Sequence, residues 1–529
     1  MTGGDRDRGG GDRGGEAAGA RLEYDYVIVG GGTAGAVVAA RLSEDPRVSV
    51  GVLERGPSDR DEPRALLIRR WAEMLEGEYD LDYRSVPQPR GNSHIRQARA
   101  AILGGCSSHN TMIALKPPAA DFDRWAAGGA RGWDAASMDP YFGRLAVHIV
   151  PVAPQHRNSY LADVIRAAAT ALGIPAREAW NTEAYADGTG FLPIGYYPET
   201  GIRSSSSVAY LHPVTDDRKN LELHCGTRVL KVLVDGDRRA SGVAARRPDG
   251  SAVTVSARRE VILCCGAIDT PRLLLLSGIG PAGQLRQHGI EVVADLPGVG
   301  ANLCDHPEGI VVWEAARPLP RAGATDWDMT IMYRSDPGRE VADVLAHVPL
   351  MTFAMHPERL GFQIPARSLS MTPNVTRPRS RGTVSLASAD PDDPPLIDYR
   401  SFTDSDGYDE RLLLAGIRMA RRVAAQPPMA GWLAREVFPG PEVRSDEDLS
   451  ALARAASHTV YHVSCTARMG APGDPDAVLD PELRVRGVGS VRVIDASAFP
   501  SLTTVNPVIA VLMLAERGAE IVARAARVA

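Results

Sequence analysis

A histidine that could bond covalently to a bulky ligand ends a short run of small residues, Gly104-Gly105-Cys106-Ser107-Ser108-His109-Asn110. Two adjacent glycines let a ligand approach the backbone closely, and the small hydroxyl residues after them can donate hydrogen bonds to it. For this motif alone, a surface or capping histidine is the alternative. The run therefore predicts ligand contacts at Gly105, His109 and Asn110.

Two further side chains are suited to removing the proton of a hydroxyl group. His462, with an ordinary pKa near neutrality, could accept that proton and stabilise the alkoxide as it forms. Asn506 could hold the same oxygen without competing for the proton. A core histidine bonded to the backbone, and an asparagine that caps the last helix, are the alternatives.

A dinucleotide-binding pattern opens the chain. A buried strand, a helix and a second apolar strand are predicted between residues 26 and 54. The turn between strand and helix reads G-x-G-x-x-G, with Gly30, Gly32 and Gly35 as its glycines, and Glu54 follows about twenty positions later. The helix N-terminus would face a pyrophosphate, and Glu54 could accept a hydrogen bond from a ribose hydroxyl. The pattern does not choose between FAD and NAD.

A second long motif, residues 266–280, predicts a turn, a short apolar helix opened by Pro271 and a glycine stop. Together with the fingerprint, the Gly-Gly…His run, the Arg-Met-Gly after His462 and the proline after Asn506, it resembles the glucose-methanol-choline (GMC) oxidoreductases. This resemblance covers roughly residues 24–525. The Cys-Ser-Ser-His-Asn form of the first run is similar to the choline oxidase subgroup.

The resemblance implies an FAD-dependent enzyme that oxidises a primary alcohol, choline or a choline-like amino alcohol. Hydride would pass to the flavin, which O2 or another acceptor would reoxidise, with O2 giving hydrogen peroxide. It implies FAD bound covalently through His109, a second cofactor contact at Asp495, and catalysis by His462 and Asn506. The pocket for the quaternary ammonium group is implied to consist of Glu308, Trp71, Trp327 and Tyr461, with His347 as a second pocket histidine.

Two of these assignments have alternatives. Asp495 could equally cap a helix. If Tyr461 and His462 lay in an extended strand, they would point to opposite faces, and Tyr461 would miss the pocket.

Some residues depart from the choline oxidase pattern. Thr111 replaces a serine, Leu115-Lys116-Pro117 stands where bulky aromatic residues are usual, and Val463-Ser464-Cys465 replaces the usual Pro-Val-Gly. In the pocket, Lys116 would repel a quaternary ammonium group. These changes surround the substrate and keep other functions open: a GMC enzyme for another primary alcohol, and a lyase with structural FAD. The His462–Asn506 pair argues against a third, a module that binds FAD without turnover.

The predicted fold class is α/β, with a Rossmann-like FAD-binding domain and a substrate-binding domain of antiparallel sheet and helices. A chain of 529 residues suits two domains. We assign residues 24–165, 205–307 and 455–529 to a discontinuous FAD-binding domain, and residues 166–204 and 308–454 to the substrate-binding domain. Residues 1–23, rich in glycine and charge, predict a disordered tail.

Composition excludes several classes of protein. With 44% hydrophobic and 23% charged residues the chain resembles an ordinary globular protein, and its net charge of −6 gives no reason to expect nucleic acid or an anionic membrane as partner. Six cysteines without zinc spacing predict neither a disulfide framework nor a metal site. No apolar run is long enough to span a membrane and no secretory leader pattern is apparent, so we expect a cytoplasmic protein. The near absence of lysine suggests a GC-rich bacterial genome, and a homodimer is among the oligomeric states allowed.

Overall fold

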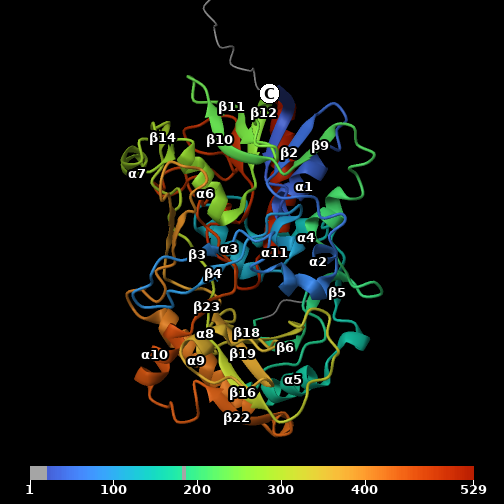
Figure 1. Cartoon of the computed structure of the whole chain (residues 1–529), viewed down its shortest axis with the longest axis vertical. Coiled ribbons are helices and arrows are strands. Elements are labelled where there is room, and N and C mark those ends of the chain that lie inside the picture. The colour runs from blue at the N-terminus through green and yellow to red at the C-terminus, as the bar shows by residue number, and fades with distance from the viewer. Residues whose placement is uncertain (1–20, 182–185, 529) are drawn as a thin grey trace, which may run out of the picture.

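The computed structural model describes residues 21–181 and 186–528. Two β-sheets lie at opposite ends of the molecule, and a layer of loops, short strands and short helices lies between them (Figure 1). This layer includes α2 (Pro63–Leu66), α3 (Ala119–Ala127) and α4 (Ala135–Phe142). Short hairpins add β3 (Tyr83–Arg84) with β4 (Arg96–Gln97), and β20 (Thr383–Ser385) with β21 (Leu396–Asp398).

The first sheet has seven strands in the order β10-β11-β12-β1-β2-β9, with β24 also paired to β12. Its strands are β1 (Arg21–Val29), β2 (Val50–Glu54), β9 (Leu221–Cys225), β10 (Arg228–Val234), β11 (Ala240–Arg246), β12 (Ala252–Leu263) and β24 (Val491–Val493). Strands β9, β2, β1, β12 and β24 are parallel to one another, while β11 pairs antiparallel with both β12 and β10. Ligands of such open parallel sheets bind beyond the carboxyl ends of the strands.

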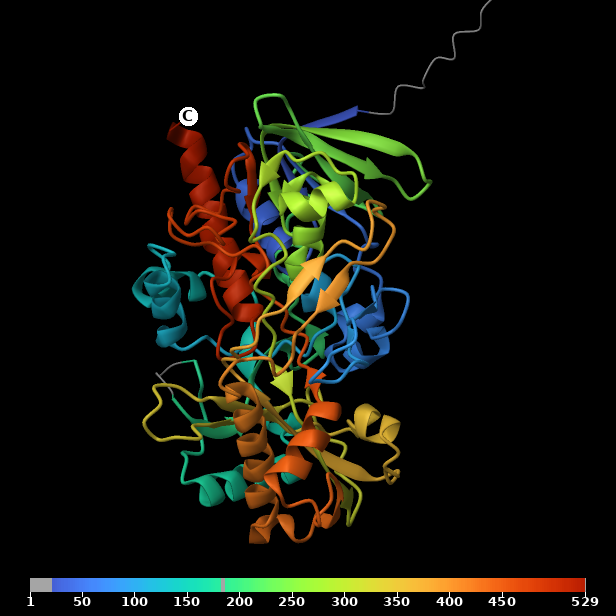
Figure 2. The ribbon, with the colours of Figure 1, turned by 90° about the vertical axis from the view of Figure 1, so that its left-hand side faces the viewer.

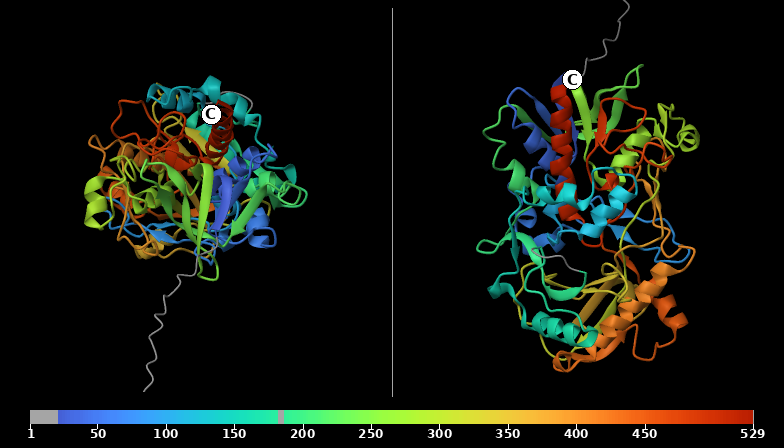
Figure 3. Two further views of the ribbon diagram at one scale, coloured as in Figure 1. Left: turned by 90° about the horizontal axis from the view of Figure 1, so that it is seen from above. Right: turned by 180° about the vertical axis from the view of Figure 1, so that it is seen from behind.

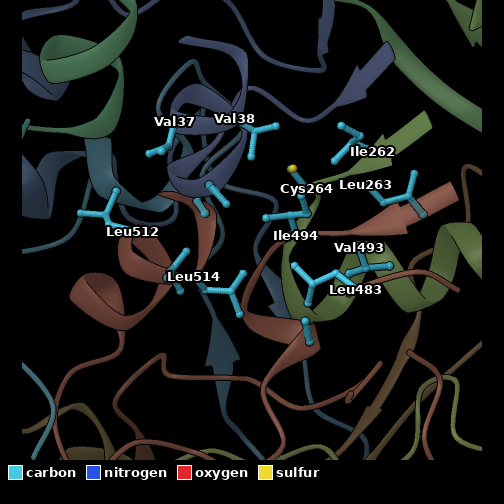
Figure 4. Close-up of a cluster of buried hydrophobic side chains, with 14 of the residues drawn as sticks. Val37, Val38, Ile262, Leu263, Cys264, Leu483, Val493, Ile494, Leu512 and Leu514 are labelled. Atoms are coloured by element: carbon cyan, nitrogen blue, oxygen red, sulfur yellow. The ribbon is translucent and has the colours of Figure 1, made fainter. Parts of the chain in front are cut away.

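Both ends of the chain contribute to the core of this sheet. Helix α1 (Thr33–Leu42) follows β1, and α11 (Val508–Val528) packs beside it, as the view from behind shows (Figure 3). Figure 4 shows Val37 and Val38 of α1 with Leu512 and Leu514 of α11 near Ile262 of β12, all of them buried. Helix α6 (Gly266–Leu276) packs against β10.

The second sheet is antiparallel, in the order β22-β16-β19-β18-β17-β6, with β15 paired to β19 and β23. Its strands are β6 (Gly188–Phe191), β15 (Pro307–Glu308), β16 (Val311–Ala315), β17 (Met329–Tyr333), β18 (Val344–His347), β19 (Ser368–Val375), β22 (Leu433–Phe438) and β23 (His458–Thr459). Helices α5 (Ser159–Leu172) and α9 (Tyr408–Ala424) pack on the sheet, and α10 (Asp446–Ala455) packs on α9 (Figure 2). Helix α9 buries an apolar stripe that includes Leu413, Ile417 and Ala420.

The remaining elements are short. They are α7 (Ala282–Gln287), α8 (Met355–Arg359), β5 (Ile149–Pro151), β7 (Pro193–Tyr197), β8 (Ile202–Arg203), β13 (Ile279–Gly280) and β14 (Ala294–Asp295). Single helical turns cover Ile68–Met74, Gly105–Ser108, Pro154–His156, Ser207–Leu211, Pro427–Met429 and Ala496–Ala498. Because these elements are short, much of the middle layer consists of loops, and loops often carry functional side chains.

The predicted fold class, a parallel-sheet unit combined with an antiparallel sheet and helices, is confirmed. Strand β1 begins at Arg21, so residues 21–23 of the predicted tail instead pair with β12; residues 1–20 lie outside the described residues. The domain boundaries stay predictions. Strand β23, which we assigned to the FAD-binding domain, pairs with β15 of the second sheet, because the chain must return there to bring residue 462 to the cavity.

Three observations concern the described residues taken together. Within residues 21–181 and 186–528, no helix is long and apolar enough to cross a membrane. Over the same ranges, no three His, Cys, Asp or Glu side chains lie where they could hold a metal ion together. All six cysteines have free thiols.

Candidate active site

A large cavity of about 550 Å³ contacts both sheets. One part of its lining, the glycine wall, consists of Gly30, Gly32, Glu54, Gly105 and His109. Another part, the aromatic wall, consists of Trp71, Trp327, Phe353 and Tyr461 together with the carboxylate of Glu308. The side chains of His462, Asn506 and His347 also line this cavity, so it collects nearly every residue singled out in the sequence.

Backbone atoms form the core of the glycine wall. Gly30, with φ +95°, ends β1 where a Cβ would lie 2.7 Å from the carbonyl oxygen of Cys264. A Cβ on Gly105, with φ +53°, would lie 2.7 Å from the Cα of Gly32, so the two glycine-rich segments touch. This bare backbone at the start of α1 is the cradle that a pyrophosphate requires.

Gly35 differs from the other fingerprint glycines because it does not line the cavity. A Cβ at this position would lie 1.9 Å from the carbonyl oxygen of Gly30. Its absence allows α1 to pack directly on the turn after β1. Gly35 therefore contributes to the site through packing, whereas the sequence predicted a cofactor contact.

Two carboxylates of the first sheet line the cavity and also hold its backbone in place. Glu54 accepts the amide hydrogens of Gly31 at 2.8 Å and Gly56 at 2.7 Å, and burial raises its pKa to about 7. Asp495 accepts the amide hydrogen of Gly266 at 2.9 Å and the hydroxyl of Thr270 at 2.6 Å. Asp495 is also the N-cap of the turn Ala496–Ala498, so capping and a position on the cavity occur together.

The imidazole of His109 lies on the cavity just after the turn Gly105–Ser108. Burial lowers its pKa to about 3, so the ring is neutral at physiological pH and keeps a lone pair with which to form a bond. Asn110 lines the cavity next to it, and its backbone carbonyl accepts a hydrogen bond from Arg203. The backbone cradle, the carboxylate of Glu54 and this neutral imidazole fit an FAD molecule.

Hydrogen bonds fix the tautomer of His462. His306 Nε2 lies 2.9 Å from both the Thr376 and Thr503 carbonyl oxygens, so this nitrogen must carry the hydrogen. His306 Nδ1 is then an acceptor, and the Nδ1 of His462, 2.8 Å away, must donate to it. The Nε2 of His462 is left with a lone pair. Burial holds the pKa of His462 well below its ordinary value, so the ring is neutral.

Asn506 adjoins the basic nitrogen of His462. Its Nδ2 lies 3.3 Å from His462 Nε2, and its Oδ1 has no hydrogen-bond partner among the described residues. Asp305 accepts the backbone N–H of His462 at 2.9 Å, which anchors the segment that carries the imidazole. Since His462 Nε2 carries the lone pair, Asn506 Nδ2 donates to it, and a bound hydroxyl oxygen would take its place between the two side chains.

The aromatic wall is a continuous series of ring contacts. The Trp71 and Trp327 rings meet edge to face at 5.1 Å, and Trp327 meets Phe353 in the same way at 5.9 Å. The Tyr461 hydroxyl lies 3.0 Å from His458 Nε2, and the ring of His458 lies 5.7 Å from that of Phe353. The four rings of the wall are thus supported by one another and by a buried histidine.

Tyr461 and His462 both line the cavity, which two consecutive residues of an extended strand could not do. The reason is the backbone of Tyr461, which has φ +62° and leaves strand β23 in a left-handed turn. The condition under which Tyr461 would have missed the pocket is therefore not met.

Glu308 and His347 supply polar groups beside the aromatic wall. Both side chains are buried, on β15 and β18, and the Glu308 Oε1 lies 4.0 Å from the His347 Nδ1. That separation is too long for a hydrogen bond, and this nitrogen has no other partner within the described part of the chain. Burial raises the pKa of Glu308. A buried carboxylate with so little compensation is suited to a cationic ligand.

The residues that depart from the choline oxidase pattern fall in different places. Thr111 and Val463 line the cavity. Lys116 does not: its ammonium group pairs with Asp139 and lies 5.2 Å above the ring of Phe142. Repulsion between Lys116 and a cationic substrate is therefore not expected.

Sequence reasoning missed four residues of the site. Arg99 and Phe353 line the cavity, while His306 and His458 support His462 and Tyr461 from behind. The signal for His306 was its place directly before Pro307 and Glu308. Arg99, Phe353 and His458 lie outside every motif, so only their contacts reveal them.

Sequence profiles of GMC oxidoreductases match residues 24–308 and 378–515. The chain is 46% identical to choline oxidase of Arthrobacter globiformis, over 96% of this chain and 95% of that enzyme. It is 35% identical to the mitochondrial choline dehydrogenase of Homo sapiens, over 95% of this chain and 90% of the other.

Solved structures agree with these sequence matches. Pyridoxine 4-oxidase from Mesorbium loti superposes with a TM-score of 0.86 and 27% identity, over 94% of this chain and 98% of the other. Formate oxidase superposes with a TM-score of 0.85 and 25% identity, over 96% and 99% of the two chains. The predictions of an enzyme acting on CH–OH groups and of FAD as its cofactor are confirmed: the chain belongs to the GMC oxidoreductase family.

Proposed function

We propose that this protein oxidises choline, or a primary alcohol with a similar quaternary ammonium group, and passes the electrons from FAD to O2. The observation that carries the proposal is a single cavity that combines a proton-accepting nitrogen with a cation site. His462 Nε2 is the proton-accepting nitrogen, and Glu308 with the aromatic wall is the cation site. The 46% identity to an enzyme named choline oxidase supports the same substrate class.

The proton of the alcohol goes to His462 Nε2 in this mechanism. His306 keeps the opposite ring nitrogen protonated, so the lone pair faces the substrate and not the protein interior. The low pKa of His462, caused first by burial, keeps the ring ready to accept a proton over the physiological range. Asn506 Nδ2, 3.3 Å from this nitrogen, donates to the alkoxide oxygen.

The ammonium end of the substrate binds against Glu308, Trp327 and Tyr461. A desolvated quaternary cation gains about 2 kcal/mol at a well-placed ring face, and a buried carboxylate adds a direct charge interaction. The bound cation would stabilise the ionised form of Glu308, which burial alone disfavours. This end of the cavity therefore sets the substrate class and orients the alcohol toward His462.

Bound FAD supplies the acceptor for the hydride of the alcohol carbon. Gly30, Gly32 and Gly105 would hold its phosphates and rings against bare backbone, and Glu54 its ribose. His109 is the residue we propose for a covalent bond to the flavin, because its neutral imidazole lies on the same wall. His347 is proposed as an additional polar contact for the substrate. Since all six thiols are free, the reducing cytoplasm is the compartment that suits the chain.

The test is anaerobic mixing of the yellow holoenzyme with choline and, separately, with 3,3-dimethylbutan-1-ol, its neutral isostere. Rapid bleaching of the flavin by choline at far lower concentration than by the isostere is the expected result. Equal bleaching by both alcohols would support proton transfer to His462 but would show that the substrate is a neutral alcohol and not choline. Thr111 and Val463, which line the cavity, are the residues that would then deserve substitution. No bleaching by any alcohol would favour a lyase with structural FAD.

A further inference from the structure

Two buried thiols, Cys304 and Cys465, meet behind the catalytic histidine, and the proposed reaction uses neither. Cys304 is 2% exposed and Cys465 is 0% exposed. The two thiols interact with each other, the Cys304 thiol also donates to the carbonyl oxygen of Asn302 at 3.3 Å, and both thiols are free. Cys304 directly precedes Asp305 and His306, and Cys465 follows three residues after His462. The pair therefore connects the two segments that place the catalytic imidazole.

The backbone holds these two residues within reach of a disulfide bond. Cys304 and Ser464 form an antiparallel bridge, with amide-to-carbonyl distances of 3.0 Å and 2.9 Å. The Cα atoms of such a pair lie about 5.5 Å apart, and the next residue on the diagonal lies roughly 6.5 Å away. Disulfide bonds span Cα separations of about 4.4–6.8 Å.

The conformation of Cys465 turns its side chain toward this partner. Its φ is +75°, a left-handed value that strains a residue with a Cβ, and it stands where glycine is usual in the choline oxidase pattern. In an extended strand, the side chain after Ser464 would point to the opposite face. The left-handed turn allows contact with Cys304 instead.

The surroundings favour reaction at Cys304. The hydrogen bond from Cys465 lowers the pKa of the Cys304 thiol, against burial, and the positive charges of Arg381 and Arg124 add to this effect. Asp305 opposes it. The residues on either side of Cys304, Leu303 and Asp305, line a second cavity of about 30 Å³, which neither cysteine itself lines.

We propose that Cys304 and Cys465 form a peroxide-sensitive dithiol whose oxidation to a disulfide slows the enzyme. The Cys304 thiolate attacks one oxygen of hydrogen peroxide: the S–O bond forms, the O–O bond breaks, and the other oxygen leaves as hydroxide and becomes water. The Cys465 thiol then attacks the sulfenic sulfur, so that the S–S bond forms, the S–O bond breaks and a second water leaves. Two thiols are oxidised as one peroxide is reduced to two waters.

The disulfide would disturb catalysis because of its place in the fold. Asp305, next to Cys304, accepts the backbone N–H of His462 at 2.9 Å, and His306 holds the imidazole at 2.8 Å. An S–S bond of about 2.05 Å draws these segments closer than the reduced thiols require. The contacts of His462 then change, while the glycine wall keeps its geometry. The proposal rests on the proposed function only for the natural source of the peroxide.

The experiment adds hydrogen peroxide itself to the reduced holoenzyme, without substrate. Peptide mass spectrometry after alkylation is expected to show a Cys304–Cys465 cross-link lighter by two hydrogen atoms. The rate of flavin reduction, measured with whichever alcohol reduces the flavin, should fall in step with the cross-link and recover with dithiothreitol, while the FAD content stays constant. C465G and C304S should keep their rates in peroxide. The matched control C225S, at a half-buried thiol outside the large cavity, should be inactivated like the parent.

Two results would overturn the proposal. One is an activity loss while both thiols remain alkylatable, which would place the oxidation elsewhere. The other is a complete cross-link with an unchanged rate of flavin reduction. C465G is informative even though it removes a buried side chain, because glycine suits the left-handed backbone, and C304S tests the other partner independently. Since the cross-link is detected by mass, a failure of the proposed substrate would not hide the result.

Discussion

The two walls of the cavity differ in what makes them functional. The glycine wall works because side chains are absent: Gly30, Gly32 and Gly105 expose backbone that a ligand can touch. The aromatic wall works because large side chains are present and support one another, as Trp71, Trp327 and Phe353 do through edge-to-face contacts. A Cβ added at Gly30 or Gly105 would clash with neighbouring backbone, whereas the aromatic wall depends on packing that can vary.

This difference also separates cofactor from substrate. A wall built from backbone is nearly fixed once α1 packs on β1, so it suits one invariant ligand. A wall built from side chains on five separate segments can change one residue at a time, so it suits a substrate that differs among relatives. Single substitutions in each wall can test whether the two walls are independent.

The largest effect is expected for His462→Ala. Loss of the proton acceptor should lower the rate of flavin reduction by about 10²–10⁴-fold, because general base catalysis contributes that much. FAD content, measured by the flavin absorbance of the purified protein, should stay at the parent level since His462 lies outside the glycine wall. His288→Ala, at the end of α7, is the control for removing a histidine. A variant that loses its flavin would show that the walls are coupled.

The second effect concerns the glycine wall. Gly35→Ala places a Cβ 1.9 Å from the carbonyl oxygen of Gly30, so α1 must shift. We expect a loss of about 1–3 kcal/mol in the free energy of unfolding, and a lower FAD content, as for other overpacked sites. Gly283→Ala in α7, where a Cβ meets nothing within 4 Å, should be neutral. The preference of residual holoenzyme for choline over its isostere should not change, and a change there would contradict independent walls.

The sequence predicted the glycine wall better than the aromatic wall, for a physical reason. Gly30, Gly32, Gly105 and His109 lie in short contiguous motifs whose local backbone carries the function. Gly35 shows a limit of such motifs, because packing and ligand contact both require a missing Cβ. The opening βαβ unit was likewise predictable, apart from the start of β1 at Arg21, where pairing with β12 extends the strand.

The aromatic wall is assembled by tertiary contacts that no local pattern encodes. Trp71 and Tyr461 were predicted through a resemblance, not through spacing. Phe353 and His458 were missed because their role exists only when the loop before α8 meets β23. The left-handed turn at Tyr461 was also invisible in the sequence, since tyrosine has no preference for it. A single φ angle thus decides whether this ring reaches the cavity.

The third prediction tests the cation site. Glu308→Gln removes the buried charge and should weaken choline binding by about 2 kcal/mol, roughly thirtyfold in KM. The KM for 3,3-dimethylbutan-1-ol should change little, because that alcohol carries no charge. Glu314→Gln on β16 removes a half-buried carboxylate that pairs with Arg435 outside the cavity, and it controls for net charge. An equal loss for both alcohols would mean that Glu308 supports the wall structurally and does not select the cation.

The smallest effect is expected for substitutions of His306, which test how the proton acceptor His462 is held from behind. His306→Gln keeps an amide near the two carbonyl oxygens but loses the acceptor for His462 Nδ1. The activation barrier should therefore rise by about 1 kcal/mol, which lowers the rate of flavin reduction roughly fivefold. Because the Nδ1 lone pair of His306 stabilises the protonated ring of His462, the base of the variant should protonate at lower pH. A neutral base is lost as pH falls through its pKa, so the acid limb of kcat/KM should move to lower pH. His306→Asn, whose amide oxygen can replace Nδ1 as the acceptor, should return the acid limb of kcat/KM to the pH of the parent enzyme. If both variants lose rate with no movement of the limb, His306 only packs behind His462, and the tautomer assignment is wrong.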